Sequence, residues 1–268
     1  MEIHGFNKTT LLDYPGCVAA TIFTGNCNFR CPFCHNAGLV LDPKGQETIS
    51  EEDVLTYLQK RKGILDGVCI TGGEPTLQPD LKDFIKKIKD LGYLVKLDTN
   101  GYRPEVLWEL LSEELLDYVA MDIKASRERY ALAAGVKNLD LARIEESVGI
   151  LKSCAIPYEF RTTVVKGIHG IQEFEAIGRW LEGSKAYYLQ AFQENENMIC
   201  LYQEDIMKMQ NAVESERIID SKHVCDGETF CKDNDEHGMF GAFSREEMEK
   251  MAETARKYID KVALRGVE

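Results

Sequence analysis

Three cysteines stand close together in the segment Cys27-Asn28-Phe29-Arg30-Cys31-Pro32-Phe33-Cys34. Three residues separate the first cysteine from the second, and two separate the second from the third. Thiolates this close can share one metal centre, and sulfur ligands favour zinc or iron–sulfur clusters. Three protein ligands would leave one iron of a four-iron cubane open for a substrate. The segment therefore predicts a metal centre on Cys27, Cys31 and Cys34.

Structural zinc is the main alternative for this segment. His35 follows Cys34 directly, so three cysteines and one histidine could form a tetrahedral zinc site. The adjacent side chains of Cys34 and His35 would then have to turn toward the same ion, which is awkward. Three free thiols are a further alternative, but the close spacing argues against them.

Polar motifs follow several apolar segments along the chain. They are Thr71-Gly72-Gly73-Glu74-Pro75, Asp98-Thr99-Asn100-Gly101 and Asp122-Ile123-Lys124, and Arg161 lies within the fifth apolar segment. Each is ordinary alone, because glycine-rich and Asp-Thr-Asn-Gly segments make turns and the charged residues could form ion pairs. The carboxyl ends of parallel barrel strands, however, converge on one mouth. Together the motifs predict a polar site there, beside the three cysteines.

Short apolar segments alternate with helical patterns along the chain. Strands are expected at residues 17–23, 68–71, 93–97, 118–123, 158–165 and 186–189, with an edge strand at 262–264. Helical periodicity lies between them, and such alternation indicates parallel strands with crossover helices. The predicted fold class is α/β, as a partial (β/α)6 TIM-type barrel of parallel strands. An open doubly wound sheet is the alternative.

Residues 194–243 interrupt this alternation with a polar, acidic stretch. It contains Cys200, His223, Cys225, Cys231 and His237, whose spacing fits no standard metal-ligand pattern. We interpret the stretch as an irregular insertion or flap within one domain of residues 1–268. Ser244 and Glu247 then resemble a capping box at the start of the last helix.

The composition excludes several functional classes. The formal net charge of -13 argues against nucleic acid as a partner, because an acidic surface repels phosphates. No run of about 18 apolar residues occurs and the N-terminus lacks a secretion signal, so we expect no membrane association. Nine cysteines, an odd number, argue against a disulfide framework and favour the reducing cytoplasm.

The cysteine spacing, with an aromatic residue directly before Cys34, resembles that of the radical S-adenosylmethionine (SAM) superfamily. Within it, the resemblance is closest to activating enzymes of glycyl radical enzymes, and among these to activating proteins of anaerobic ribonucleoside-triphosphate reductase. It rests on residues 8–16 (Lys-Thr-Thr-Leu-Leu-Asp-Tyr-Pro-Gly), 34–36 (Cys-His-Asn), 98–101 (Asp-Thr-Asn-Gly) and 121–124 (Met-Asp-Ile-Lys). It covers about residues 5 to 193 and resumes near residue 244.

This resemblance implies that the three cysteines hold one 4Fe–4S cluster, whose fourth iron binds SAM. Phe33 would pack near the adenine of the cofactor. The segment of Gly72, Gly73 and Glu74 would hold its amino group. The resemblance thus implies that residues which would otherwise be assigned to ordinary turns bind the cofactor.

Charged residues complete the implied site. Asp98 and Asp122 would help to bind a monovalent cation beside the cofactor, while Lys124 and Arg161 would lie near its methionyl carboxylate or ribose. Gln193 stands where pyruvate formate-lyase activase has a histidine after its sixth strand. We include Gln193 among the implied cofactor-binding residues, although this difference weakens the assignment of the partner.

The implied activity is reductive cleavage of SAM to a 5′-deoxyadenosyl radical, which would install a glycyl radical on a partner enzyme. A flavodoxin or ferredoxin would supply the electron. Activation of pyruvate formate-lyase or another glycyl radical enzyme is an alternative, as is radical modification of a small molecule or peptide. A non-catalytic zinc-binding module is a further alternative.

Overall fold

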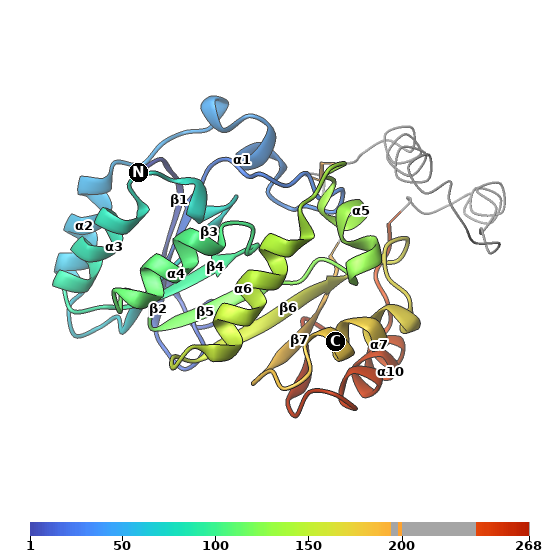
Figure 1. Cartoon of the computed structure of the whole chain (residues 1–268). Coiled ribbons are helices and arrows are strands. Elements are labelled where there is room, and N and C mark those ends of the chain that lie inside the picture. The colour runs from blue at the N-terminus through green and yellow to red at the C-terminus, as the bar shows by residue number, and fades with distance from the viewer. Residues whose placement is uncertain (194–197, 200–239, 268) are drawn as a thin grey trace.

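One eight-stranded sheet forms the centre of the molecule, in a computed structural model that describes residues 1–193, 198–199 and 240–267 (Figure 1). The strands lie side by side in sequence order. They are β1 (Ile3–Thr10), β2 (Ala19–Thr24), β3 (Gly67–Gly72), β4 (Leu94–Thr99), β5 (Tyr118–Asp122), β6 (Tyr158–Val164), β7 (Tyr187–Ala191) and β8 (Val262–Arg265). β2 to β8 are parallel, and β1 pairs antiparallel with β2.

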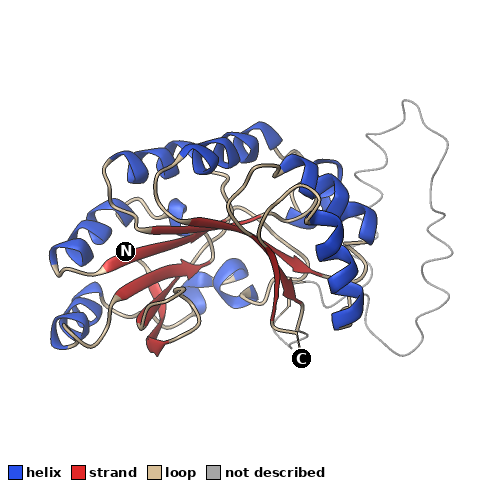
Figure 2. Cartoon of the chain, turned by 90° about the horizontal axis from the view of Figure 1, so that it is seen from below, coloured by secondary structure: helices blue, strands red, loops and turns tan. Residues whose placement is uncertain are grey.

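Helices connect the parallel strands and cover the outside of the sheet, which curves as Figure 2 shows. They are α1 (Ala37–Leu41), α2 (Glu51–Lys60), α3 (Leu81–Asp90), α4 (Pro104–Ser112), α5 (Tyr130–Ala134), α6 (Leu141–Ser153), α7 (Ile171–Trp180) and α10 (Arg245–Ala255). β1 and β8 are the two outermost strands in the part of the chain described, so the sheet does not close. The predicted α/β fold is therefore confirmed.

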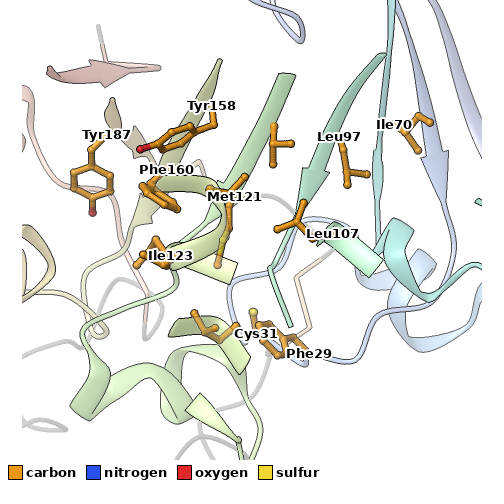
Figure 3. Packing of buried hydrophobic residues seen from close by; sticks show 14 of the residues in the cluster. Phe29, Cys31, Ile70, Leu97, Leu107, Met121, Ile123, Tyr158, Phe160 and Tyr187 are labelled. Carbon is orange, nitrogen blue, oxygen red and sulfur yellow. The ribbon is translucent and has the colours of Figure 1, made fainter. Parts of the chain in front are cut away.

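The two faces of the sheet differ because successive side chains of a strand point to opposite sides. The outer face is apolar and packs against the helices; Figure 3 shows Ile70, Leu97, Met121, Phe160 and Tyr187 there, with Leu107 of α4. The intervening positions include Cys69, Lys96, Asp98, Asp122 and Arg161. The sheet thus presents a polar, charged inner face.

Among the strands of the described residues, β1 is the one that the sequence analysis does not predict. Only its end residues, Ile3 and Thr10, are buried, and its pairing with β2 contains two register irregularities. Such a strand shows neither a clear apolar run nor a strict alternation. Its place in the sheet comes from pairing with the strongly apolar β2.

The expected insertion lies largely outside the described residues. The candidate ligands Cys200, His223, Cys225, Cys231 and His237 all belong to this undescribed part. The helix after it begins as predicted, because Ser244 and Glu247 form a reciprocal capping box. No helix in the described part of the chain has the length and apolar character to cross a membrane.

Candidate active site

The three clustered cysteines lie in the loop between β2 and α1, residues 25–36, which we call the cluster loop. Backbone hydrogen bonds fix it at several points. Asn26 N–H donates to Leu39 O at 2.8 Å, and Arg30 N–H donates to Ala134 O at 2.8 Å. Within the loop, Cys34 N–H donates to Cys31 O at 3.0 Å. The loop is therefore anchored to α1 and α5 at the carboxyl end of the sheet.

The glycine pair at the end of β3, Gly72 and Gly73, is required by the close approach of this loop. A Cβ atom on Gly73 would lie 1.9 Å from the carbonyl oxygen of Asn26. Glu74 N–H donates to the same oxygen at 2.8 Å. Gly72 has a φ of +115°, which side chains rarely allow. The Gly-Gly sequence thus lets the β3 loop pack directly on the cluster loop.

Cys31 of the cluster loop is buried, Cys27 and Cys34 are half-buried, and the charge of Lys124 acts on all three thiols. Burial, helped by Glu74, raises the pKa of Cys27 to about 11. Burial likewise raises the pKa of Cys31 to about 12, with a smaller opposing effect from Lys124. Burial also raises the pKa of Cys34. A positively charged metal centre would stabilise the thiolates that this buried loop otherwise disfavours.

His35, the fourth ligand that the zinc alternative requires, has other partners. Among the described residues, no three His, Cys, Asp or Glu side chains are placed to hold a single metal ion. The ring of His35 instead packs against Phe192, with centroids 5.5 Å apart, and bonds to the backbone of Gln193. Cysteines around a cubane each bind a different iron, so they need not converge on one point.

Two asparagines, Asn100 after β4 and Asn28 in the cluster loop, are joined by a hydrogen bond. Tyr102 N–H donates to Asn100 Oδ1 at 2.9 Å, which fixes the orientation of the Asn100 amide. Asn100 Nδ2 therefore donates to Asn28 Oδ1 at 2.8 Å and lies 3.8 Å from Cys27 Sγ. This leaves Asn28 Nδ2 buried without a hydrogen-bond partner among the described residues.

The unpaired side-chain amide of Asn28 and the three thiols of the cluster loop together fit an iron–sulfur cluster. Buried donors are rarely left unpaired, and cluster sulfurs accept hydrogen bonds from nearby N–H groups. Phe29 N–H already points to Cys27 Sγ at 3.4 Å. Cys27, Cys31 and Cys34 would hold such a cluster, with Asn28 and Asn100 as nearby donors.

Glu74 connects the β3 and β4 loops. Its Oε1 accepts hydrogen bonds from Thr76 N–H at 3.1 Å, Thr76 Oγ1 at 2.6 Å and Thr99 Oγ1 at 2.7 Å. Its Oε2 accepts one from Asn100 N–H at 2.7 Å. Burial raises the pKa of this carboxyl, and the four donors oppose that rise. The carboxylate thus holds Asn100 and its loop in place.

Five charged side chains alternate in sign across the inner face, and we call them the ion-pair chain: Lys96, Asp98, Arg161, Asp122 and Lys124. Lys96 Nζ contacts Asp98 Oδ1, and Arg161 Nη1 lies 3.1 Å from Asp98 Oδ2. Arg161 Nε lies 2.8 Å from Asp122 Oδ1, and Lys124 Nζ lies 3.0 Å from Asp122 Oδ2. Despite burial, the cations hold the pKa of Asp98 and Asp122 below the usual range.

The end of β5 is held by a buried histidine that the sequence analysis did not select. Val165 N–H donates to His169 Nδ1 at 3.0 Å, so His169 Nε2 carries the proton and donates to Lys124 O at 2.8 Å. The imidazole is therefore neutral, and burial lowers its pKa to about 4. Phe33 packs edge-on against it, with centroids 6.4 Å apart.

The structure brings most of the sequence-predicted residues together through shared contacts. Gln193 takes part through its backbone, which bonds to His35, while the residue itself is exposed just after β7. Sequence reasoning missed Lys96, Asn28 and Asn36, whose Nδ2 donates to Gly72 O at 2.9 Å. Their only signal was position, since Asn28 and Asn36 lie within quoted motifs and Lys96 stands two residues before Asp98.

Comparison with known proteins agrees with this architecture. The family model described as the Radical SAM superfamily matches residues 21–181. A protein of Methanocaldococcus jannaschii named "Putative glycyl-radical enzyme activating enzyme MJ1227" is 31% identical over 80% of this chain and 88% of its own. A "Probable GTP 3',8-cyclase" of Thermococcus kodakarensis is 35% identical, over 54% of this chain and 47% of its own.

Solved structures support the fold. Streptococcus suis SuiB, bound to its precursor peptide SuiA, matches with a TM-score of 0.55 and 13% identity. The match covers 73% of this chain and 45% of the SuiB chain. With the family match over residues 21–181 and the cysteine loop at the mouth of the sheet, the chain belongs to the radical SAM superfamily.

Proposed function

We propose that this radical SAM enzyme activates a glycyl radical enzyme of the anaerobic ribonucleoside-triphosphate reductase type. The observation that carries the proposal is the similarity to the Methanocaldococcus jannaschii protein named as an activating enzyme, which extends over 88% of that protein. A second such protein of the same organism is 28% identical over 60% of this chain. The cyclase relative matches little more than half of the chain and supports only the shared superfamily core.

Cys27, Cys31 and Cys34 would hold one 4Fe–4S cluster. When bound, such a cluster supplies one electron to SAM, whose S–C5′ bond breaks to give methionine and a 5′-deoxyadenosyl radical. The protein's own part is to hold the cofactor, exclude water and orient the bond. The backbone at Gly72 and Gly73 would receive the amino group, because the Glu74 carboxylate already accepts four hydrogen bonds within the protein.

The ion-pair chain would orient the cofactor's carboxylate. Three cations and two anions leave one positive charge (3 − 2 = +1) on this part of the inner face. Lys124 follows the carboxyl end of β5, and Arg161 lies in the middle of β6 on the inner face, where this excess can meet a methionyl carboxylate. Phe33 would contact the adenine, and the exposed Gln193 would lie at the rim. The proposal includes no monovalent metal ion.

The radical would then take a hydrogen atom from a glycine Cα, giving 5′-deoxyadenosine and a glycyl radical. The open sheet is compatible with a protein substrate, because β1 and β8 do not pair with each other in the described part of the chain. We further propose a flavodoxin or ferredoxin as reductant, a cytoplasmic location and a single domain.

Electron paramagnetic resonance tests the proposal. Anaerobically reconstituted protein, dithionite, SAM and an anaerobic ribonucleoside-triphosphate reductase are mixed, and the glycyl radical doublet is measured together with 5′-deoxyadenosine. A reductase with its radical glycine changed to alanine is the matched control. We expect a doublet only with the unmodified reductase.

Other results would assign the chain differently. A doublet only with pyruvate formate-lyase would change the partner. Cleavage of SAM coupled to turnover of a small molecule, without any doublet, would overturn the activase assignment while leaving the superfamily chemistry intact. Protein that held zinc but no iron after reconstitution would contradict both.

A further inference from the structure

Every carboxylate oxygen of the ion-pair chain contacts a cation of the protein itself. Asp98 has one oxygen on Lys96 and the other on Arg161. Asp122 has one oxygen on Arg161 and the other on Lys124. Each of the four carboxylate oxygens therefore already meets a cationic donor. These are the same two carboxylates that were expected to bind a monovalent cation.

Lys96 is the unusual member of this arrangement. Its side chain is 3% exposed, although lysines almost never lie fully buried unless they are paired. It reaches the inner face from the middle of β4, two residues before Asp98 and on the same side of the strand. Its Nζ also lies 3.7 Å from Cys69 Sγ and 6.0 Å from the ring centroid of Tyr118. Among the described residues, Asp98 is the one carboxylate with which it forms an ion pair.

We propose that the Lys96 ammonium occupies the place of the monovalent cation, so that the cofactor side of the sheet is complete without Na⁺ or K⁺. An additional metal ion at Asp98 and Asp122 would stand beside three positive groups, which would repel it. A tethered ammonium also needs no capture from solution. The inference requires SAM binding but not a particular target of the radical, so it stands apart from the proposed glycine target.

Ion dependence tests this inference directly. SAM binding to the reconstituted protein is measured by equilibrium dialysis in choline, sodium and potassium chloride at equal ionic strength, and thermal unfolding of the cluster-free protein is followed in the same salts. We expect the wild type to bind with an affinity that differs by less than about twofold among the three salts. A wild-type affinity that rose about tenfold or more with Na⁺ or K⁺ would overturn the proposal.

Lys96→Met removes the ammonium and leaves one Asp98 oxygen without its cation. In choline its SAM affinity should fall by about tenfold or more, because a charge-assisted contact is lost beside the cofactor. Na⁺ or K⁺ should restore part of this affinity and raise its unfolding temperature. A folded variant whose SAM affinity and unfolding temperature did not change with Na⁺ or K⁺ would contradict the inference.

Two further variants separate the inference from general salt effects. Lys89 pairs with Asp117 away from the site, with 2.7 Å between Nζ and Oδ2. Lys89→Met removes this lysine, and neither its SAM affinity nor its unfolding temperature should rise specifically with Na⁺ or K⁺. The double variant Lys96→Met with Asp98→Asn removes both charges of the pair. It should fold, and its unfolding temperature should be the same in all three salts. It keeps the test decisive if Lys96→Met alone does not fold, because a specific Na⁺ or K⁺ response of the double variant would overturn the proposal.

Discussion

The two faces of the central sheet are made by the same strands but carry opposite chemistry. Met121 and Phe160 point outward into the helical layer, whereas their neighbours Asp122 and Arg161 pair on the inner face. The outer residues are held by packing, which is nondirectional and sensitive to lost volume. The inner residues are held by charge and hydrogen bonds of fixed geometry. Changes to the inner face should therefore abolish chemistry, and changes to the outer face should reduce stability.

Loss of a cluster ligand should give the largest effect. Cys31→Ala removes one of three thiolates, so bound iron and SAM cleavage should fall to background. This loss is larger than the loss of up to about 100-fold in metal affinity or activity that follows when a residue hydrogen-bonded to a metal ligand is changed. The unfolding free energy should change by only about 1 kcal/mol. Iron analysis, 5′-deoxyadenosine formation and urea unfolding measure the three quantities. Cys154→Ala, a half-buried cysteine outside the cluster loop, is the control.

The converse change on the outer face should act on stability. Phe160 is completely buried, so Phe160→Ala should lower the unfolding free energy by about 3–5 kcal/mol through lost burial and a cavity. The remaining folded fraction should still bind iron in proportion to its amount. A variant of normal stability with reduced iron per folded molecule would show that the two faces are not separable in this way.

His169, whose ring bonds to the backbone of Val165 and Lys124, should make stability depend on pH. Its pKa is lowered by burial from 6.5 to about 4, so between these values the unfolded chain binds more protons than the folded one. Stability from this residue should therefore fall by up to about 3 kcal/mol as the pH drops from 6.5 to 4. Unfolding free energies of cluster-free wild type and His169→Gln measure it. Parallel pH curves for the two proteins would contradict the assignment.

An exposed ion pair should show the smallest effect. Arg179 pairs with Glu175 one turn away on α7, 2.7 Å between Nη2 and Oε1, and its side chain is 65% exposed. Arg179→Ala should cost less than about 0.5 kcal/mol of unfolding free energy and leave SAM cleavage unchanged. A loss of more than about 2 kcal/mol of unfolding free energy would contradict this expectation. It would mean that an exposed ion pair with good geometry stabilises this protein as much as a buried contact does.

Much of the architecture could be predicted because each parallel strand is short, apolar on one side and followed by a turn. The strand expected at residues 158–165 became β6 (Tyr158–Val164), and that expected at 118–123 became β5 (Tyr118–Asp122). β1 could not be predicted in the same way. Its residues carry little apolar signal, and partner β2 supplies the missing information.

Glu74 shows why site roles are harder to predict than site positions. The Gly-Gly-Glu segment could be selected from sequence, but the four donors to the carboxylate come partly from Thr99 and Asn100 on another loop. Lys96 shows the same limit, because a lysine inside a predicted strand carries no mark of its partner. Hydrogen bonds between loops follow from the placement of strands, not from local spacing.

The sequence alone determined that three cysteines follow a buried strand and that polar residues end the strands after it. Local spacing and alternation carry that information, because a strand's period and a loop's length are set by the backbone. Only the tertiary structure decided that Lys96, Arg161 and Lys124 neutralise both aspartates and that Asn28 keeps a free donor beside Cys27. Those outcomes require segments that are far apart in the chain to meet, and the curved sheet brings them to one face.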